Sequence, residues 1–124
     1  MKKVLVIDDE PEILSILSFR ISNWGYDPLP AGGGREGIEL AEEEHPDLVI
    51  LDVMMPILDG FETLKRLKQS EATKNIPVIM ITVANAKMEV EKGISMGANF
   101  YLTKPYDAQE LKSKIIQLIG EGEK

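Results

Sequence analysis

Short apolar runs alternate along the chain with segments in which apolar residues recur at helical spacing. Four runs are predicted to be buried strands because they lack strict alternation of polar and apolar residues: Val4–Ile7, Leu48–Leu51, Val78–Ile81 and Phe100–Leu102. A weaker run, Tyr26–Ala31, contains Pro28 and Pro30, and proline cannot donate a hydrogen bond to a β-ladder. This run is therefore predicted to be an edge strand.

Amphipathic helices are predicted between and after these strands. The first begins near Pro11 and places its apolar residues on one face: Ile13, Leu14, Leu17, Ile21 and Trp24. Further helices are predicted over 34–44, after Asp59 as an N-cap, over 86–96, and after Asp107, which has capping-box spacing to Glu110. The helix over 86–96 has the thinnest apolar stripe, and Gly93 interrupts it.

This order of elements predicts an α/β fold. A strand is followed by a helix five times, which is typical of a parallel sheet with helices on both faces. Five units are too few for an eight-stranded barrel, so an open, doubly wound sheet is expected. A length of 124 residues fits one domain, and residues 1–124 are assigned to it.

Composition narrows the function classes. Hydrophobic residues make up 44% of the chain, which excludes a disordered linker. The 14 Lys and Arg against 21 Asp and Glu give a net charge of −7, which argues against binding to nucleic acid. The absence of Cys excludes disulfides, iron–sulfur clusters and thiol catalysis. No apolar run is long enough to span a bilayer and no signal peptide is recognisable, so a cytoplasmic location is expected.

Polar residues end the predicted strands. Asp8-Asp9-Glu10 follows the first strand, Asp52 ends the third, Thr82 ends the fourth and Lys104-Pro105 follows the fifth. In open α/β sheets, ligands bind at the carboxyl ends of the strands. One such residue alone usually serves a turn or a helix cap. Carboxylates about 4 Å apart repel by roughly 4 kcal/mol, however, so a cluster of them at one edge favours a divalent cation such as Mg²⁺.

The same set of residues is suited to phosphoryl transfer. A carboxylate can act as the nucleophile and form an aspartyl phosphate. Asp52 is the expected nucleophile because it stands alone on a central strand, whereas the adjacent Asp8 and Asp9 suit a metal clamp. Lys104 and a metal would neutralise the phosphoryl oxygens, and Thr82 would donate a hydrogen bond to one of them.

Taken together, these motifs resemble the receiver domain of two-component response regulators over essentially the whole chain. The matching segments are Val4 to Glu10, Asp47 to Pro56 with Asp59-Gly60, Val78 to Thr82, and Gly97 to Pro105. The resemblance implies a flavodoxin-like (βα)5 fold with a five-stranded parallel sheet in the order 2-1-3-4-5. It also implies a phosphorylatable signalling switch rather than a metabolic enzyme, one that catalyses its own phosphorylation and the slow hydrolysis of its aspartyl phosphate.

The resemblance also implies a role for each site residue. Asp52 accepts the phosphoryl group and, together with Asp9 and the backbone carbonyl of Met54, binds Mg²⁺. Asp8 assists the metal, often through water. Lys104 pairs with a phosphoryl oxygen, and its bond to Pro105 is expected to be cis.

The implied switch consists of Thr82, which turns inward toward the phosphoryl group, and Tyr101, which moves between exposed and buried positions. Repacking then changes the face formed by the fourth helix, the fifth strand and the fifth helix. The expected partners are a histidine kinase or phosphotransfer protein as donor, and an output protein or fused output domain at that face. Direct contact with nucleic acid or membrane is not expected.

Two departures from the family pattern concern the site. Val83 is larger than the residue that most receivers carry after the threonine, and it could crowd the phosphoryl group. This residue leaves a second hypothesis open, namely a receiver-like interaction module that is not phosphorylated. Met54 and Ala84 cannot orient a water molecule, so slow loss of the phosphoryl group is predicted, and Asn at 54 with Glu at 84 is expected to accelerate it.

Two further sequence features, a glycine pattern and the histidine, are interpreted as structural and not functional. Gly32, Gly34 and Gly37 spell the G-x-G-x-x-G pattern of dinucleotide-binding loops. They follow the predicted edge strand rather than a central one, so a loop before the second helix is the preferred interpretation. His45, the only histidine, precedes Pro46 and is predicted to cap a helix end.

Overall fold

The computed structural model describes residues 1–52, 60–83, 91 and 94–123. The strands are β1 (Lys3–Ile7), β2 (Asp27–Ala31), β3 (Leu48–Asp52), β4 (Val78–Val83) and β5 (Phe100–Lys104). The helices described are α1 (Pro11–Asn23), α2 (Gly34–Glu44), α3 (Gly60–Gln69) and α5 (Ala108–Ile119). The helix predicted over 86–96 and the N-cap predicted at Asp59 fall largely or wholly outside the described residues.

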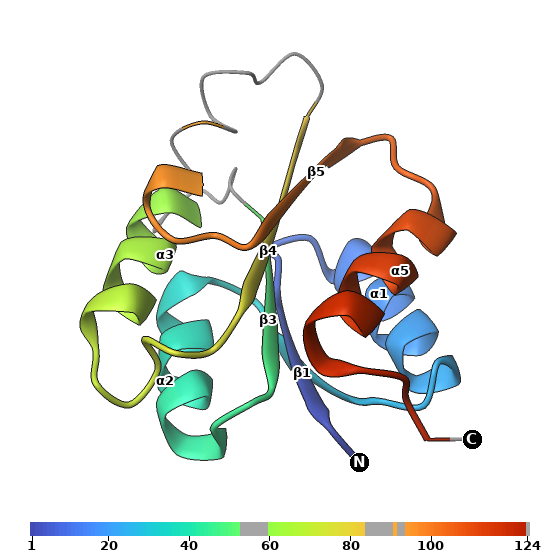
Figure 1. Ribbon diagram of the computed structural model, residues 1–124, viewed down its shortest axis with the longest axis horizontal. Helices are drawn as coiled ribbons and strands as arrows, with labels where there is room; N and C mark the ends of the chain where they lie inside the picture. The colour runs from blue at the N-terminus through green and yellow to red at the C-terminus, as the bar shows by residue number, and fades with distance from the viewer. Residues whose placement is uncertain (53–59, 84–90, 92–93, 124) are drawn as a thin grey trace.

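The five strands form one parallel sheet in the order β2-β1-β3-β4-β5. The expected α/β architecture and strand order are therefore confirmed. Helices α2 and α3 cover one face of the sheet, and α1 and α5 cover the other (Figure 1).

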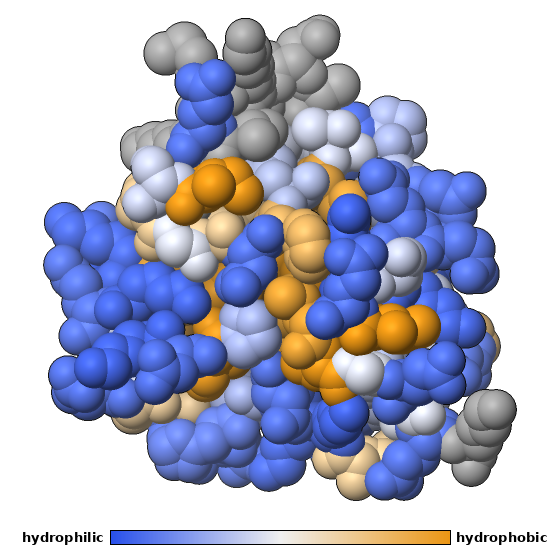
Figure 2. Space-filling model, in the orientation of Figure 1, coloured by the Kyte–Doolittle hydropathy of each residue, from blue (hydrophilic) through white to orange (hydrophobic). Residues whose placement is uncertain are grey.

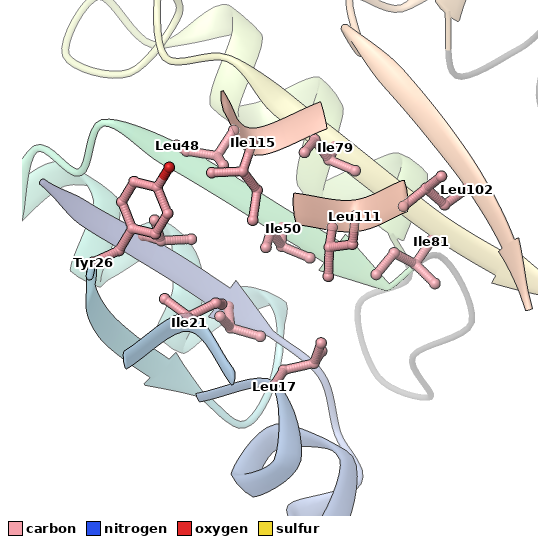
Figure 3. Close-up of a cluster of buried hydrophobic side chains, with 12 residues drawn as sticks. Leu17, Ile21, Tyr26, Leu48, Ile50, Ile79, Ile81, Leu102, Leu111 and Ile115 are labelled. Atoms are coloured by element: carbon pink, nitrogen blue, oxygen red, sulfur yellow. The ribbon is translucent and has the colours of Figure 1, made fainter. Parts of the chain in front are cut away.

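Two hydrophobic clusters hold the helices against the sheet. Along β1, Leu5 and Ile7 belong to the cluster under α2 and α3, whereas Val4 and Val6 belong to the cluster under α1 and α5. Figure 3 shows the second cluster, in which side chains from both helices converge on those of the strands. Because each central strand is buried on both faces, its sequence reads as a continuous apolar run.

Strand β2 lies at one edge of the sheet, as its prolines predicted. The Asp27 N–H donates to the Lys2 carbonyl at 2.8 Å, and the Ala31 carbonyl accepts from the Asp8 N–H at 3.1 Å. The polar backbone groups of residues 27 and 31 thus face β1. Because backbone groups alternate in direction along a strand, the nitrogens of Pro28 and Pro30 face away from the sheet, where no ladder bond is lost.

Local signals position the helix ends as expected. Pro11 is the first residue of α1, where a missing N–H costs nothing. Asp107 caps α5, although its side chain accepts from the Gln109 N–H at 2.8 Å rather than from Glu110. His45 ends α2 in the left-handed conformation, with a φ of 48°. None of the described helices is both long enough and apolar enough to cross a membrane.

Candidate functional site

The parallel sheet brings the predicted site residues to one edge. Asp8 directly follows β1, and Asp52 is the last residue of β3. In β4, Thr82 is paired with Thr103, the neighbour of Lys104, which ends β5. Met54 lies outside the described residues, and so does the side chain of Val83. The strand-end residues that the structure describes therefore meet at the carboxyl edge, as the sequence predicted.

Asp52 and Lys104 form the central ion pair of this edge. The Lys104 Nζ lies 3.5 Å from the Asp52 Oδ2. The Asp52 side chain is 7% exposed, whereas that of Lys104 is 32% exposed. The carboxylate is thus nearly enclosed and lies beside a cation that is still open to solvent. A buried carboxylate next to a positive charge is suited to accept a group that brings further negative charge.

Asp8 is a buried acid of the site with a raised pKa. It is 3% exposed, and its Oδ1 accepts the Glu10 N–H at 2.9 Å. The pKa of Asp8 is raised from 3.8 to about 6, mainly because the carboxyl is buried. The charges of Asp52 and Asp9 contribute to this rise, and the Glu10 N–H and Lys104 oppose it. The site therefore favours an added positive charge, whether a proton or a cation.

The donor set at this edge fits a magnesium ion. One carboxylate oxygen from each of Asp8, Asp9 and Glu10 lies within 4.8 Å of the others. Mg²⁺ prefers oxygen ligands, and a buried acid with further carboxylates beside it gains from a nearby cation. Glu10 was not among the predicted metal residues, although it stands next to them in the sequence. The metal roles predicted for Asp9, Asp52 and Met54 stay predictions.

Thr82 supplies a buried hydroxyl group. The residue is 1% exposed, and its Oγ1 has no hydrogen-bond partner among the described residues. A buried hydroxyl without a partner costs about 1–3 kcal/mol. This arrangement suits a hydroxyl that bonds an oxygen of a bound group.

Tyr101 lies beside this region on β5. It pairs with Met80 across the ladder and packs against the cluster under α2 and α3. Its hydroxyl oxygen is buried. The predicted switch residue is therefore partly buried in the present structure, with its hydroxyl oxygen inaccessible to solvent.

The segment after β5 adds a residue that sequence reasoning missed. The Lys104–Pro105 bond is cis, as expected. Tyr106 follows it and packs against the cluster under α1 and α5. Burial raises the pKa of the Tyr106 phenol, and the charge of Asp8 raises it further against the opposing effect of Arg20. Tyr106 therefore lies within electrostatic reach of the site, and its place after Lys104-Pro105 was the available signal.

The glycine-rich segment serves packing. A Cβ on Gly37 would overlap the side chain of Ile7, so glycine is needed where α2 crosses β1. Gly34 and Gly37 are buried within α2. The glycine pattern is thus explained by packing, and only Gly32 and Gly33 lie in the predicted loop before α2.

Comparisons with known proteins point to one family. The model of the response regulator receiver domain matches residues 4–116. Among curated proteins, the chain is 37% identical over 122 residues to the alkaline phosphatase synthesis transcriptional regulatory protein PhoP of Bacillus subtilis, covering 98% of this chain and 50% of the relative. It is 39% identical over 119 residues to the DNA-binding dual master transcriptional regulator RpaA of Synechocystis, covering 96% and 49%. The chain thus spans about half the length of these curated relatives.

Solved structures agree with the sequence relatives. The chemotaxis protein CheY4 of Vibrio cholerae matches with a TM-score of 0.90 and 30% identity, covering 96% of this chain and 99% of that one. A response regulator receiver domain from Clostridium thermocellum matches with a TM-score of 0.89 and 34% identity, covering 96% and 94%. These chains share the fold over nearly their full lengths.

Proposed function

The chain belongs to the response regulator receiver family of two-component systems, and on this premise we propose that Asp52 is its phosphoryl acceptor. The observation that carries the proposal is the enclosed Asp52 carboxylate, which lies 3.5 Å from the Lys104 ammonium and beside the acids that follow β1. A nucleophile for phosphoryl transfer needs an approach path and compensation for the incoming charge. The partly exposed Lys104 leaves such a path open and supplies positive charge, and a cation held by the acidic edge would supply more.

The proposed reaction moves one phosphoryl group. A carboxylate oxygen of Asp52 attacks the phosphorus atom of a donor phosphohistidine or acyl phosphate. The new P–O bond forms as the P–N or P–O bond to the leaving group breaks, and the leaving group takes up a proton from solvent or keeps its charge. Lys104 compensates charge on the phosphoryl oxygens, and Thr82 donates its unused hydroxyl hydrogen to one of them.

The acidic edge would hold the cofactor Mg²⁺. Among the described residues, carboxylate oxygens of Asp8, Asp9 and Glu10 converge. The family resemblance implies Asp8, Asp9, Asp52 and the backbone carbonyl of Met54 as the metal residues. A bound Mg²⁺ supplies charge neutralisation at the phosphoryl oxygens. Before phosphorylation, the same charge would lower the pKa of Asp8, which burial and, to a smaller extent, the charges of Asp52 and Asp9 raise.

The donor is proposed to be a histidine kinase or phosphotransfer protein that docks beside this edge. Helix α1 begins directly after Asp8–Glu10 and exposes two large apolar side chains, Ile16 at 49% and Phe19 at 68%. A protein that delivers a phosphoryl group to Asp52 must cover this edge, and exposed apolar side chains beside it supply contact area. Phosphorylation inside the cell by such a donor implies a cytoplasmic location.

The output is proposed to pass through the face that contains β5 and α5. When Thr82 bonds the phosphoryl group, space opens for Tyr101, and a partner that prefers one packing of this face detects the change. Figure 2 shows hydrophobic surface gathered at the centre of the visible face, where β5 crosses in front in Figure 1. Tyr101→Ala is expected to leave phosphorylation intact while partner affinity loses its dependence on phosphorylation.

The test is intact mass after incubation with Mg²⁺ and a small acyl phosphate. The parent protein is expected to gain the mass of one phosphoryl group, and Asp52→Asn is expected to gain none. Glu43→Gln, which changes an exposed acid of α2, serves as the matched control and should react like the parent. A mass gain that persists in Asp52→Asn would contradict the proposed acceptor.

The alternative is a receiver-like interaction module that is not phosphorylated, and the same assay separates it. If the parent gains no mass, Val83→Ala is compared next, since a smaller side chain after Thr82 should admit a small donor. Phosphorylation that appears only in this variant supports a narrowed but functional site. Continued absence of reaction in both proteins, also with a histidine phosphotransfer protein as donor, contradicts the phosphoryl-acceptor proposal and favours the binding module.

A further inference from the structure

The segment after α5 runs back along the molecule instead of leaving it. Figure 1 shows this C-terminal segment passing the turn between α1 and β2. The Gly120 carbonyl accepts from the Tyr26 Oη at 2.5 Å, and the Glu123 N–H donates to the Gly25 carbonyl at 2.9 Å. Residues 120–123 thus bond to a turn almost a hundred positions away in the sequence.

The first two residues of the chain also contact this segment. The Met1 ammonium lies 3.2 Å from the Glu123 Oε1, and the Lys2 Nζ donates to the Ile119 carbonyl. The Met1–Glu123 pair is exposed, so it contributes little energy by itself. Together with the two bonds above, it nevertheless defines one register of the segment against the turn.

Glycines make this contact possible. A Cβ on Gly25 would overlap the backbone of Glu123, and Gly25 has a φ of +91°. A Cβ on Gly122 would overlap the Trp24 carbonyl oxygen. The two backbones therefore approach more closely than side chains on these residues would allow. Such a close approach of two backbones indicates that the segment docks in one specific position.

The docked segment also forms one wall of a cavity. A cavity of about 300 Å³ lies between the end of α1, helix α5 and the segment. Its lining includes Trp24, Tyr26 and Lys112, with Glu121 and Gly122 contributed by the segment. Trp24 is the only tryptophan of the chain, so its emission reports on this contact without interference.

We propose that Gly120–Glu123 is a strap that docks on the Trp24–Gly25 turn and fixes where the polypeptide leaves the receiver fold. The strap ends beside Met1, at the edge where the strands begin. The acidic site lies at the opposite edge, where the strands end. Polypeptide that followed residue 123 would therefore start away from Asp52, in a direction set by the strap and not by a flexible joint.

The strap is tested by amide hydrogen exchange of the whole chain, followed by NMR at the Glu123 N–H. This amide should exchange at least about tenfold more slowly than in a free peptide of residues 117–124. Gly122→Ala should restore the free-peptide rate and shift the Trp24 emission, because the added Cβ cannot fit against the Trp24 carbonyl. Gly33→Ala is the matched control, since a Cβ there meets nothing within 4 Å.

A second variant removes one bond without adding bulk. Tyr26→Phe keeps the buried ring but loses the bond to Gly120, so Glu123 protection should fall by roughly fivefold, the factor that corresponds to one neutral hydrogen bond. Urea midpoints of all variants show whether the effect stays local to the strap. Free-peptide exchange of Glu123 in the parent, or unchanged protection in both Gly122→Ala and Tyr26→Phe, would overturn the proposal.

Discussion

Asp8→Asn should stabilise the protein in the absence of metal, although it removes a residue of the proposed site. Asp8 is 3% exposed, and its pKa rises from 3.8 to about 6 on folding. A shift of this size corresponds to about 3 kcal/mol of unfavourable free energy when Asp8 is ionised in the folded protein. Asparagine has no charge to bury, and its side-chain oxygen can still accept the Glu10 N–H.

The gain should depend on pH in a defined direction. The folded protein binds the Asp8 proton more tightly than the unfolded chain does, so ionisation destabilises the fold as pH rises from about 4 through 6. Well below pH 3.8, Asp8 is protonated in both states and the variant gains nothing, and at pH 4 its gain is still small. At pH 7.5 the expected gain is about 2 kcal/mol, below the full 3 kcal/mol because the site relaxes, or roughly 8 °C in Tm for a chain of this length.

Urea unfolding in EDTA, followed by circular dichroism at pH 4 and pH 7.5, measures this difference directly. Comparing the variant with the parent at each pH cancels the titration of the other carboxylates. Glu43→Gln removes one charge at an exposed position and should show less than about 0.5 kcal/mol at either pH. An Asp8→Asn variant that is no more stable than the parent at pH 7.5, or equally stabilised at both pH values, would refute the reasoning.

Three further outcomes are expected. Mg²⁺ at about 100 times its Kd should stabilise the parent by about 2.7 kcal/mol and Asp52→Asn by less, as thermal unfolding with and without the ion will show; equal responses would contradict the site. Thr82→Val should raise the stability of the unphosphorylated protein by about 1 kcal/mol in urea, because it removes a buried hydroxyl that lacks a partner among the described residues, and a loss would point to a hidden partner. Gly37→Ala should cost about 1–3 kcal/mol in the same assay, because its Cβ overlaps Ile7, whereas Gly33→Ala should not.

Much of the fold followed from local patterns. The apolar run Leu48–Leu51 predicted a strand buried on both faces, and β3 is buried throughout. The prolines at 28 and 30 predicted an edge, because a ladder cannot use them. The acidic edge followed in turn, since parallel strands carry Asp8 and Asp52 to the same end of the sheet.

Contacts between distant segments could not be predicted in this way. The Lys68 Nζ donates to the carbonyls of Lys74 and Ile76, at 3.2 and 2.8 Å, and burial lowers the pKa of this lysine. In the sequence, Lys68 resembles any charged residue near a helix end. The strap could not be predicted from the sequence either. The need for glycine at position 122 depends on how close the Trp24 carbonyl lies after folding. Such roles depend on which surfaces meet after folding and not on local propensity.

The outward-facing prolines of β2 have a consequence for behaviour at high concentration. A sheet edge normally presents a row of N–H donors that another chain can extend, which is a route to aggregation and fibril growth. At this edge, positions 28 and 30 offer no donor, so an incoming strand would find only carbonyl acceptors there. The prolines that weaken the strand pattern of β2 therefore also protect this edge of the sheet from strand addition. Replacing both prolines with valine would strengthen the strand pattern and, by the same change, create a surface prone to self-association.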